Sequence, residues 1–213
     1  MSDLGWVLAR TGVSDSAVGT EAWTDPGNIT IDDASNTTVA LNSGPKETEY
    51  LKATNFNFSA AGLVATDQIL GIEVKIERGQ SVNFITDKSI KLVDSDGNVV
   101  GDEKSTGANW GNYPDIVQFG GSNDKWGLNP KAIEVLNSKW GVVFQAESNP
   151  TSSTASVDAI WMKITILRDL TPNINGTVTV GQGTIGTRFI DKRWPVEEGL
   201  IAGHTKQTRR PNL

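Results

Sequence analysis

The chain has 213 residues, of which 37% are hydrophobic and 21% are charged, so it can bury a core and does not resemble a disordered segment. The net charge of −6 argues against nucleic acid as a partner, and the absence of cysteine excludes disulfides, thiolate metal sites and cysteine nucleophiles. No basic segment followed by an apolar run opens the chain, and no apolar run approaches the ~18 residues of a membrane span, so we expect a protein folded in a cytoplasm with no membrane partner.

The N-terminal part of the chain predicts an arm followed by strands. Residues 1–20 are mostly small and polar, which indicates an N-terminal arm or an edge strand. A turn cluster with adjacent Pro and Gly follows at residues 23–28. Short strands are expected at residues 29–31 and 38–41, and a longer alternating strand at residues 50–58.

Two longer segments, residues 69–78 and 155–166, alternate apolar and polar side chains and are rich in β-branched types. A period of two over this length is typical of half-buried strands, so these segments are expected to form the centre of the fold. Between them, residues 87–93 predict a strand that turns through an Asp-Gly pair within residues 94–98. Val99 and Val100 would then return as the second strand of a β-hairpin.

One short helix is expected at residues 131–138. Asn129 can act as the N-cap, and Pro130 suits the first helical position. Ile133 and Leu136 lie three residues apart, which predicts one apolar face and a helix that covers one end of a sheet pair.

Further strands at residues 116–119 and 140–147 bring the total to about eight, with turns every 8–12 residues. This spacing predicts an all-β fold: a jelly-roll-like antiparallel β-sandwich over residues 21–169, with one short helix and extended terminal arms. Residues 1–20 form the N-terminal arm or edge strand of this scheme, and residues 170–213 form an extended C-terminal assembly segment with at most one hairpin.

The C-terminal segment differs from the rest of the chain in charge and pattern. From Thr171 on it has six basic and three acidic residues, whereas the preceding residues have 13 basic and 22 acidic ones. Its apolar side chains are too many for a free tail, so we expect them to be buried against a neighbouring subunit, with basic residues pairing with the acidic body. The subunit-interface candidates are Phe189, Ile190, Trp194, Leu200, Ile201, Arg209 and Arg210.

Eight segments in order resemble a jelly-roll type domain of tailed-bacteriophage structural proteins, found in tail-fibre, head-fibre and capsid-decoration proteins. The segments are WTDPGN (23–28), YLKATNF (50–56), ILGIEVKIE (69–77), IKLV (90–93), STGANW (105–110), FGGSNDKWG (119–127), WGVVF (140–144) and TASVDAI (154–160). They span about two-thirds of the chain. The resemblance implies a virion component that acts by assembly, with other virion proteins as partners, a homo-oligomer with a trimer favoured, and no catalytic residues. Neither terminal flank matches a known pattern of the family.

Catalytic, metal and cofactor sites are not expected. His204 is the only histidine and lies in the weakly patterned tail, so a catalytic triad has no clear partners. Asp94, Asp96 and Asn98 alternate as in a calcium loop, but the glycine and glutamate that such a loop needs further on are missing, and an Asp-Gly turn explains them. Residues 181–186 imitate a dinucleotide fingerprint without the strand and helix that it requires. A carboxylate pair for glycoside hydrolysis is weighed as a distant alternative, because Glu73 and Glu77 alternate with apolar residues on a solvated strand face.

Aromatic residues in loops give a second functional hypothesis. Trp110, Tyr113 and Trp126 lie in Gly- and Asn-rich loops, where aromatic rings can stack on sugars, so they are ligand-binding candidates for a surface glycan. Packing over the end of the sandwich explains the same tryptophans without a ligand. The main hypothesis is therefore a non-enzymatic virion structural protein, a capsid-decoration, neck or fibre-attachment component, and the alternative is a receptor or carbohydrate-binding module of a tail fibre.

Overall fold

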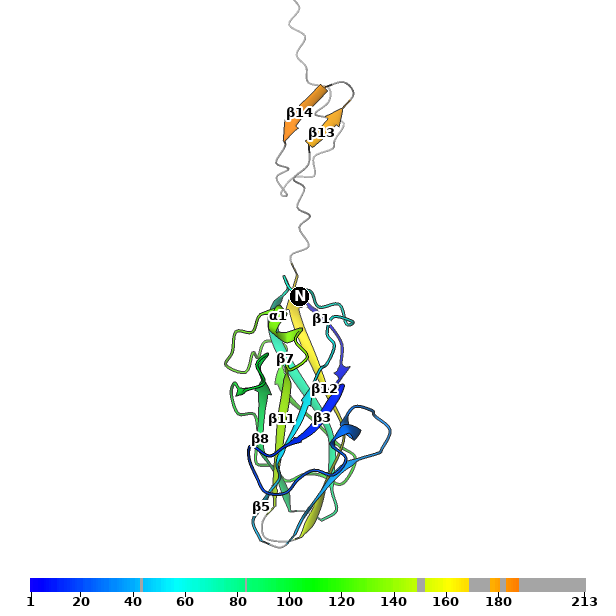
Figure 1. Cartoon of the computed structure of the whole chain (residues 1–213), viewed down its shortest axis with the longest axis vertical. Helices are drawn as coiled ribbons and strands as arrows, with labels where there is room; N and C mark the ends of the chain where they lie inside the picture. The colour runs from blue at the N-terminus through cyan, green and yellow to red at the C-terminus, as the bar shows by residue number, and fades with distance from the viewer. Residues whose placement is uncertain (43, 83, 149–151, 169–176, 181–182, 188–213) are drawn as a thin grey trace, which may run out of the picture. The chain divides into compact units, whose positions relative to one another are not determined.

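The computed structural model divides the chain into two compact units, Met1–Asp169 and Leu170–Leu213. It describes residues 1–42, 44–82, 84–148, 152–168, 177–180 and 183–187. The first unit contains two six-stranded antiparallel sheets (Figure 1), and the second contains the two-stranded sheet of β13 (Thr177–Val180) and β14 (Gly183–Thr187). No helix among the described residues is long and apolar enough to cross a membrane.

Sheet A is built around the two long central strands β7 (Gln68–Gln80) and β12 (Ser153–Leu167), which pair from Gln68 opposite Leu167 to Gln80 opposite Ala155. β10 (Asp115–Gly121) pairs with the free edge of β7. The free edge of β12 is covered by three short strands, β4 (Thr37–Leu41), β2 (Val7–Leu8) and β1 (Ser2–Asp3). The alternation predicted for residues 69–78 and 155–166 is therefore confirmed as the centre of one sheet.

Sheet B has five strands in one continuous order. They are β3 (Thr11–Asp15), β6 (Tyr50–Thr54), β11 (Gly141–Ser148), β8 (Ile85–Val93) and β9 (Val99–Val100). A sixth strand, β5 (Lys46–Glu47), pairs with the end of β11. The predicted hairpin of β8 and β9 is confirmed, and the carboxylate of Asp94 accepts the backbone N–H groups of the turn that joins them.

The core lies between the two sheets. Sheet A contributes Ile72, Val74 and Ile76, and sheet B contributes Leu51 and Phe144, all fully buried. Burial of apolar surface stabilises the fold by about 25 cal/mol per Å². The predicted fold class is thus confirmed: the unit Met1–Asp169 is a jelly-roll-like antiparallel β-sandwich.

Two predicted strands differ from the structure because of backbone conformation. The strand expected at residues 29–31 is replaced by the 3-10 helix η1 (Pro26–Ile29), which has Pro at its start and follows the left-handed Asp25. The strand expected at residues 50–58 ends at Thr54, because Asn55 and Asn57 both adopt positive φ values. Such residues leave the extended conformation, so the pairing stops although the apolar pattern continues.

The predicted helix is shorter than expected and turns a different face inward. α1 spans only Ala132–Val135, with Lys131 as its N-cap and the backbone N–H of Lys131 donating to Glu134 at 2.8 Å. Ala132 and Val135 are buried, whereas Ile133 is 57% exposed. The prediction that Ile133 forms the apolar face was therefore wrong, since a single turn offers too few positions to fix the phase of a helix.

The first residues of the chain add strands to both sheets. β1 and β2 pair with β12 of sheet A, and β3 pairs with β6 at the edge of sheet B. The chain therefore crosses from one sheet to the other between Leu8 and Thr11, where Ala9 is fully buried.

Candidate functional site

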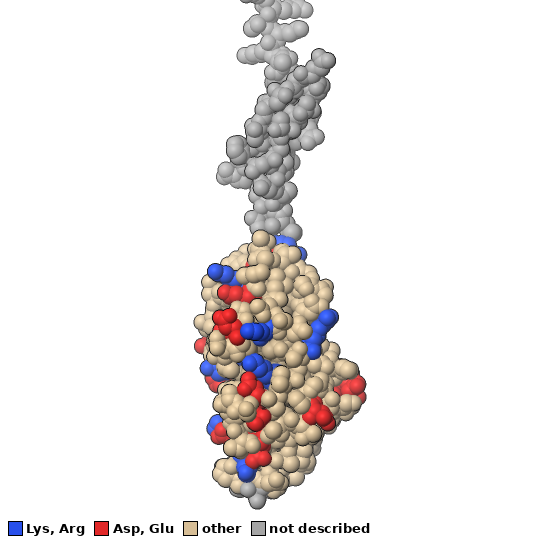
Figure 2. Space-filling model, viewed as in Figure 1, with Lys and Arg blue, Asp and Glu red and all other residues tan. Residues whose placement is uncertain are grey.

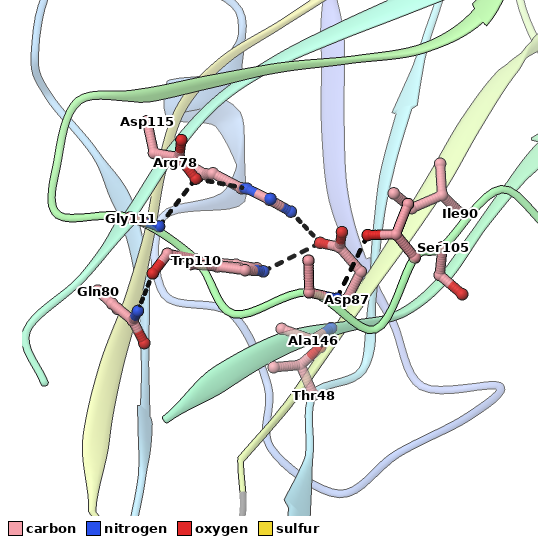
Figure 3. A network of polar contacts seen from close by, with 12 residues as sticks. Thr48, Arg78, Gln80, Asp87, Ile90, Ser105, Trp110, Gly111, Asp115 and Ala146 are labelled. Atoms are coloured by element: carbon pink, nitrogen blue, oxygen red, sulfur yellow. Dashed lines mark hydrogen bonds and ion pairs between the residues drawn. The ribbon is translucent and has the colours of Figure 1, made fainter. Parts of the chain in front are cut away.

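Trp110 does not present its ring to solvent but lies between the two sheets, 2% exposed. Its indole N–H donates to Asp87 of β8 at 2.9 Å, and its ring stacks on Phe144 with centroids 5.3 Å apart. Arg78 of β7 forms a buried ion pair with Asp87 and lies 4.9 Å from the centre of the Trp110 ring (Figure 3). Trp110 is therefore part of a polar network that joins the sheets.

Trp126 is fully buried as well, and its indole N–H donates to the carbonyl oxygen of Ile72 at 2.9 Å. Gly120 makes room for it, because a Cβ at this residue would lie 2.6 Å from the Trp126 indole nitrogen. The hypothesis that Trp110 and Trp126 stack on a sugar is thus corrected: both rings are occupied in packing. Of the three ligand-binding candidates, only Tyr113 is accessible, at 36%.

The tail candidates lie outside the described residues. This applies to Phe189, Ile190, Trp194, Leu200, Ile201, Arg209 and Arg210, and to His204. Their proposed roles in assembly stay predictions.

A groove lies at the end of sheet B where β6 ends and β3 and β11 begin. We call it the sheet B groove, and its volume is about 720 Å³. Its lining residues mostly carry hydroxyl, amide or charged side chains, together with one valine and one glycine: Thr11, Val13, Ser14, Asp15, Ser16, Lys52, Thr54, Asn55, Asp96, Gly97, Ser138 and Lys139. Residues of β3 and β6 form its floor, and the turn after β8 and the residues before β11 contribute the rest.

The charges of the sheet B groove are partly fixed by internal contacts. Lys52 pairs with Asp15 at 3.3 Å and donates to the carbonyl oxygen of Gly97 at 3.1 Å. The hydrogen bond from Lys52 to Gly97 connects β6, in the floor of the groove, to the turn between β8 and β9. Figure 2 shows Lys and Arg interspersed with Asp and Glu on one face of the molecule, without a field of one sign.

The outer face of sheet A differs from the sheet B groove because its lysines lie over aromatic rings. In the middle of β7 and β12, Lys75 lies 3.9 Å from the centre of the Trp161 ring, Lys163 lies 4.9 Å from that of Trp6, and Lys163 pairs with Glu73 at 3.0 Å. Such cation–π contacts contribute about 0.5–1 kcal/mol each at exposed sites. The contact with Trp6 attaches the segment between β1 and β2 to the sheet.

Three carboxylates gather next to these contacts on the same face, starting two residues beyond Lys75 on β7. We call Asp32, Glu77 and Asp158 the acidic cluster: one carboxylate oxygen of each lies within 4.8 Å of those of the other two. Tyr113 lies beside them, and its burial and the charges of Asp158 and Glu77 raise its pKa to about 12. None of the three residues lines the sheet B groove.

The sequence interpretation missed these groups. The alternation around Glu77 places it on the outer face of its strand, but the same pattern predicts a regular strand through Asp158. An acidic residue that interrupts an alternating pattern was the one available signal of a bulge there.

Comparison with known proteins gives no family. No known family model and no curated protein matches the sequence. Among solved structures, a CBM4 structure overlaps 75% of this chain and 94% of its own, with 10% identity and a TM-score of 0.40. The xylan-binding CBM22-1 domain from Paenibacillus barcinonensis overlaps 78% and 97%, with 7% identity and a TM-score of 0.37.

The enzymatically active domain of tailspike protein 4 from bacteriophage CBA120 overlaps 76% of this chain but only 19% of its own, with 11% identity and a TM-score of 0.34. Likenesses of this size carry no argument about ligand or partner. The resemblance to phage structural domains stays a prediction, and the assignment of the sandwich rests on the strand pairing described above.

Proposed function

We propose that the Met1–Asp169 unit is a non-catalytic binding module for a saccharide and that the sheet B groove is its site. The observation that supports this proposal is the lining of the groove. Sugar hydroxyls both donate and accept hydrogen bonds, and the groove offers hydroxyl groups from Thr11, Ser16 and Thr54 beside the amide of Asn55. A volume of about 720 Å³ lies within the range of small-ligand sites.

The charge state of the groove favours an uncharged ligand. Lys52 and Asp15 neutralise one another, so a neutral polyhydroxyl molecule meets no uncompensated charge from this pair. Among the described residues that line the groove none is aromatic, so binding would rest on hydrogen bonds rather than on ring stacking. The groove is preformed, because its floor belongs to paired strands and its turn is held by Asp94.

The absence of catalysis is part of the proposal. Asp15 is held by Lys52, and the acidic cluster lies on the other sheet, away from the groove lining. A glycosidase needs two carboxyl groups on either side of the scissile bond. Incubation of the protein with oligosaccharides should therefore release no reducing ends.

A glycan array with the full chain tests the proposal. We expect selective binding that falls when Lys52 is replaced by Met. Lys88→Met is the matched control, since Lys88 lies on the outer face of the same sheet and also pairs with acidic residues. An array without a specific signal, or equal signals for both variants, would contradict a saccharide site in the groove.

Assembly in a virion is the second candidate, as inferred from the resemblance. The observation that favours it is the second unit, Leu170–Leu213, whose positive net charge opposes that of the rest of the chain. The mass of the full chain in solution, compared with that of the chain ending at Asp169, tests it. Assembly through the tail predicts an oligomer, a trimer by the resemblance, that the shorter chain does not form.

A further inference from the structure

A β-bulge in sheet A brings the acidic cluster together. Val157 pairs with Arg78 and Ala159 pairs with Glu77, so Asp158 is an extra residue in β12 with no partner of its own in β7. Bulges redirect a side chain relative to a regular strand. Here the carboxylate of Asp158 comes close to that of Glu77 on β7 and to that of Asp32 in the loop before β4.

Asp158 is buried without a cation. It is 1% exposed, and its Oδ2 accepts the backbone N–H of Ala34 at 3.2 Å, while its Oδ1 has no hydrogen-bond partner among the residues that the structure describes. Within residues 1–168 as described, no Lys or Arg forms an ion pair with any member of the acidic cluster. Buried carboxylates are normally paired or bound to metals, so this arrangement lacks its counter-charge.

The pKa of Asp158 reflects the missing counter-charge. Burial raises its pKa, and the negative charges of Asp32 and Asp33 raise it further. Each of these causes would be offset by a positive ion placed among the three carboxylates.

We propose that the acidic cluster is a calcium site. Carboxylate oxygens are hard ligands that bind Ca²⁺ at about 2.3–2.6 Å, so two oxygens on one ion lie up to about 5 Å apart. The separations within 4.8 Å meet this limit. Mg²⁺ is smaller, at about 2.1 Å, requires near-octahedral geometry and is usually held by one or two carboxylates and several waters, so a site with three carboxylates suits Ca²⁺ better. The uncoordinated Oδ1 of Asp158 would gain a partner, and waters would complete the shell.

A bound ion would join three segments that are far apart in the chain. Asp32 belongs to the loop between η1 and β4, Glu77 to β7 and Asp158 to β12. The ion would therefore hold this loop against the outer face of sheet A. The site is independent of the sheet B groove, so its test needs no saccharide.

Isothermal titration calorimetry of the full chain with CaCl₂, after treatment with EDTA and dialysis, tests the proposal. We expect one ion per chain and a higher Tm in calcium. Glu77→Gln should weaken binding by at least about tenfold, because the number of charged ligands sets calcium affinity. Glu73→Gln is the matched control: Glu73 lies on the same face of the same strand but pairs with Lys163, so this variant should bind as the wild type does.

Asp32→Asn provides a second variant at an exposed position, in case the others unfold, and should weaken binding similarly. The Tm of every variant in EDTA shows whether it is folded. Three results would overturn the proposal: no heat and no Tm shift at millimolar CaCl₂, equal affinity in the Glu77 and Glu73 variants, or tighter binding of MgCl₂ than of CaCl₂.

Discussion

The outer faces of the two sheets differ in whether a lysine or arginine compensates the charge of neighbouring carboxylates. On sheet B, Glu47 and Glu147 lie directly opposite one another across two strands, but Lys88 contacts both, at 3.3 and 2.9 Å. On sheet A, the acidic cluster gathers three carboxylates without a described Lys or Arg in contact. Like charges that face each other across strands are destabilising unless they are compensated.

This difference indicates what each face can bind. Where the protein supplies its own counter-charges, as in the sheet B groove, a neutral hydrogen-bonding ligand fits best. Where it supplies none, as in the acidic cluster, a cation is the missing partner. Four substitutions of charged side chains test how these charges are compensated.

The largest effect is expected at the buried ion pair between the sheets. Arg78→Met removes the cation that pairs with the buried Asp87. Asp87 would then resemble Asp158, a buried carboxylate without an ion pair to a described Lys or Arg. Removing one partner of a buried pair costs about 3–5 kcal/mol. Urea denaturation should show this loss, and the double variant with Asp87→Asn should recover part of it. A loss below about 1 kcal/mol would mean that the pair is not buried as described.

The second perturbation removes the compensation within the sheet B groove. Asp15→Asn leaves Lys52 with an unpaired charge beside the ligand and removes one acceptor. We expect a fall in saccharide affinity of about tenfold, equivalent to about 1.4 kcal/mol. Calorimetric titration with the glycan selected on the array measures it, and unchanged affinity would place the ligand elsewhere.

The third perturbation concerns Asp158. The pKa of Asp158 is raised in the folded state, so its carboxyl group stabilises the fold at pH values below its ordinary pKa of about 3.9. This stabilisation is lost as the pH rises through the pKa that the group has in the folded state. At pH 7 in EDTA, Asp158→Asn should therefore have a higher free energy of unfolding than the wild type. In calcium the order should reverse, because only the wild type retains all three charged ligands. Urea denaturation under both conditions measures the two differences.

The smallest effect is expected at a compensated carboxylate at the end of sheet A. Arg168 donates to both carboxylate oxygens of Asp67, at 2.7 and 2.6 Å, and this hydrogen bonding lowers the pKa of Asp67. The ionised carboxylate of Asp67 therefore stabilises the fold at pH values above its ordinary pKa of about 3.9. This stabilisation is lost as the pH falls through the lower pKa that Asp67 has in the folded state. Asp67→Asn should thus be less stable than the wild type at pH 7, and thermal unfolding at decreasing pH should bring the two together.

The central strands could be predicted from the sequence because their signal is local. The alternation of Ile72, Val74 and Ile76 depends only on which face is buried, and the turn at Asp94 depends only on neighbouring residues. Packing of Trp126 was one of the two alternatives that the sequence offered, but its position could not be predicted, because it depends on the space left by Gly120 of β10 and on the carbonyl group of Ile72 in β7.

The candidate sites depend on long-range register for the same reason. Asp158 joins Glu77 only through a bulge, and the loop at Asp32 approaches only because Thr30 bridges to Ala159. The sheet B groove combines strands and turns that are far apart in the chain. Apart from the acidic residue that interrupts the alternation at Asp158, periodicity contains no information on such register shifts.

Amide chemical-shift mapping of the labelled full chain tests the separation of the two faces most directly. We predict that the array-selected glycan shifts residues of β3 and β6, such as Val13 and Lys52, and leaves Glu77 and Asp158 unchanged, whereas CaCl₂ does the reverse. Glycan-induced shifts at the acidic cluster without shifts in the sheet B groove would contradict this account.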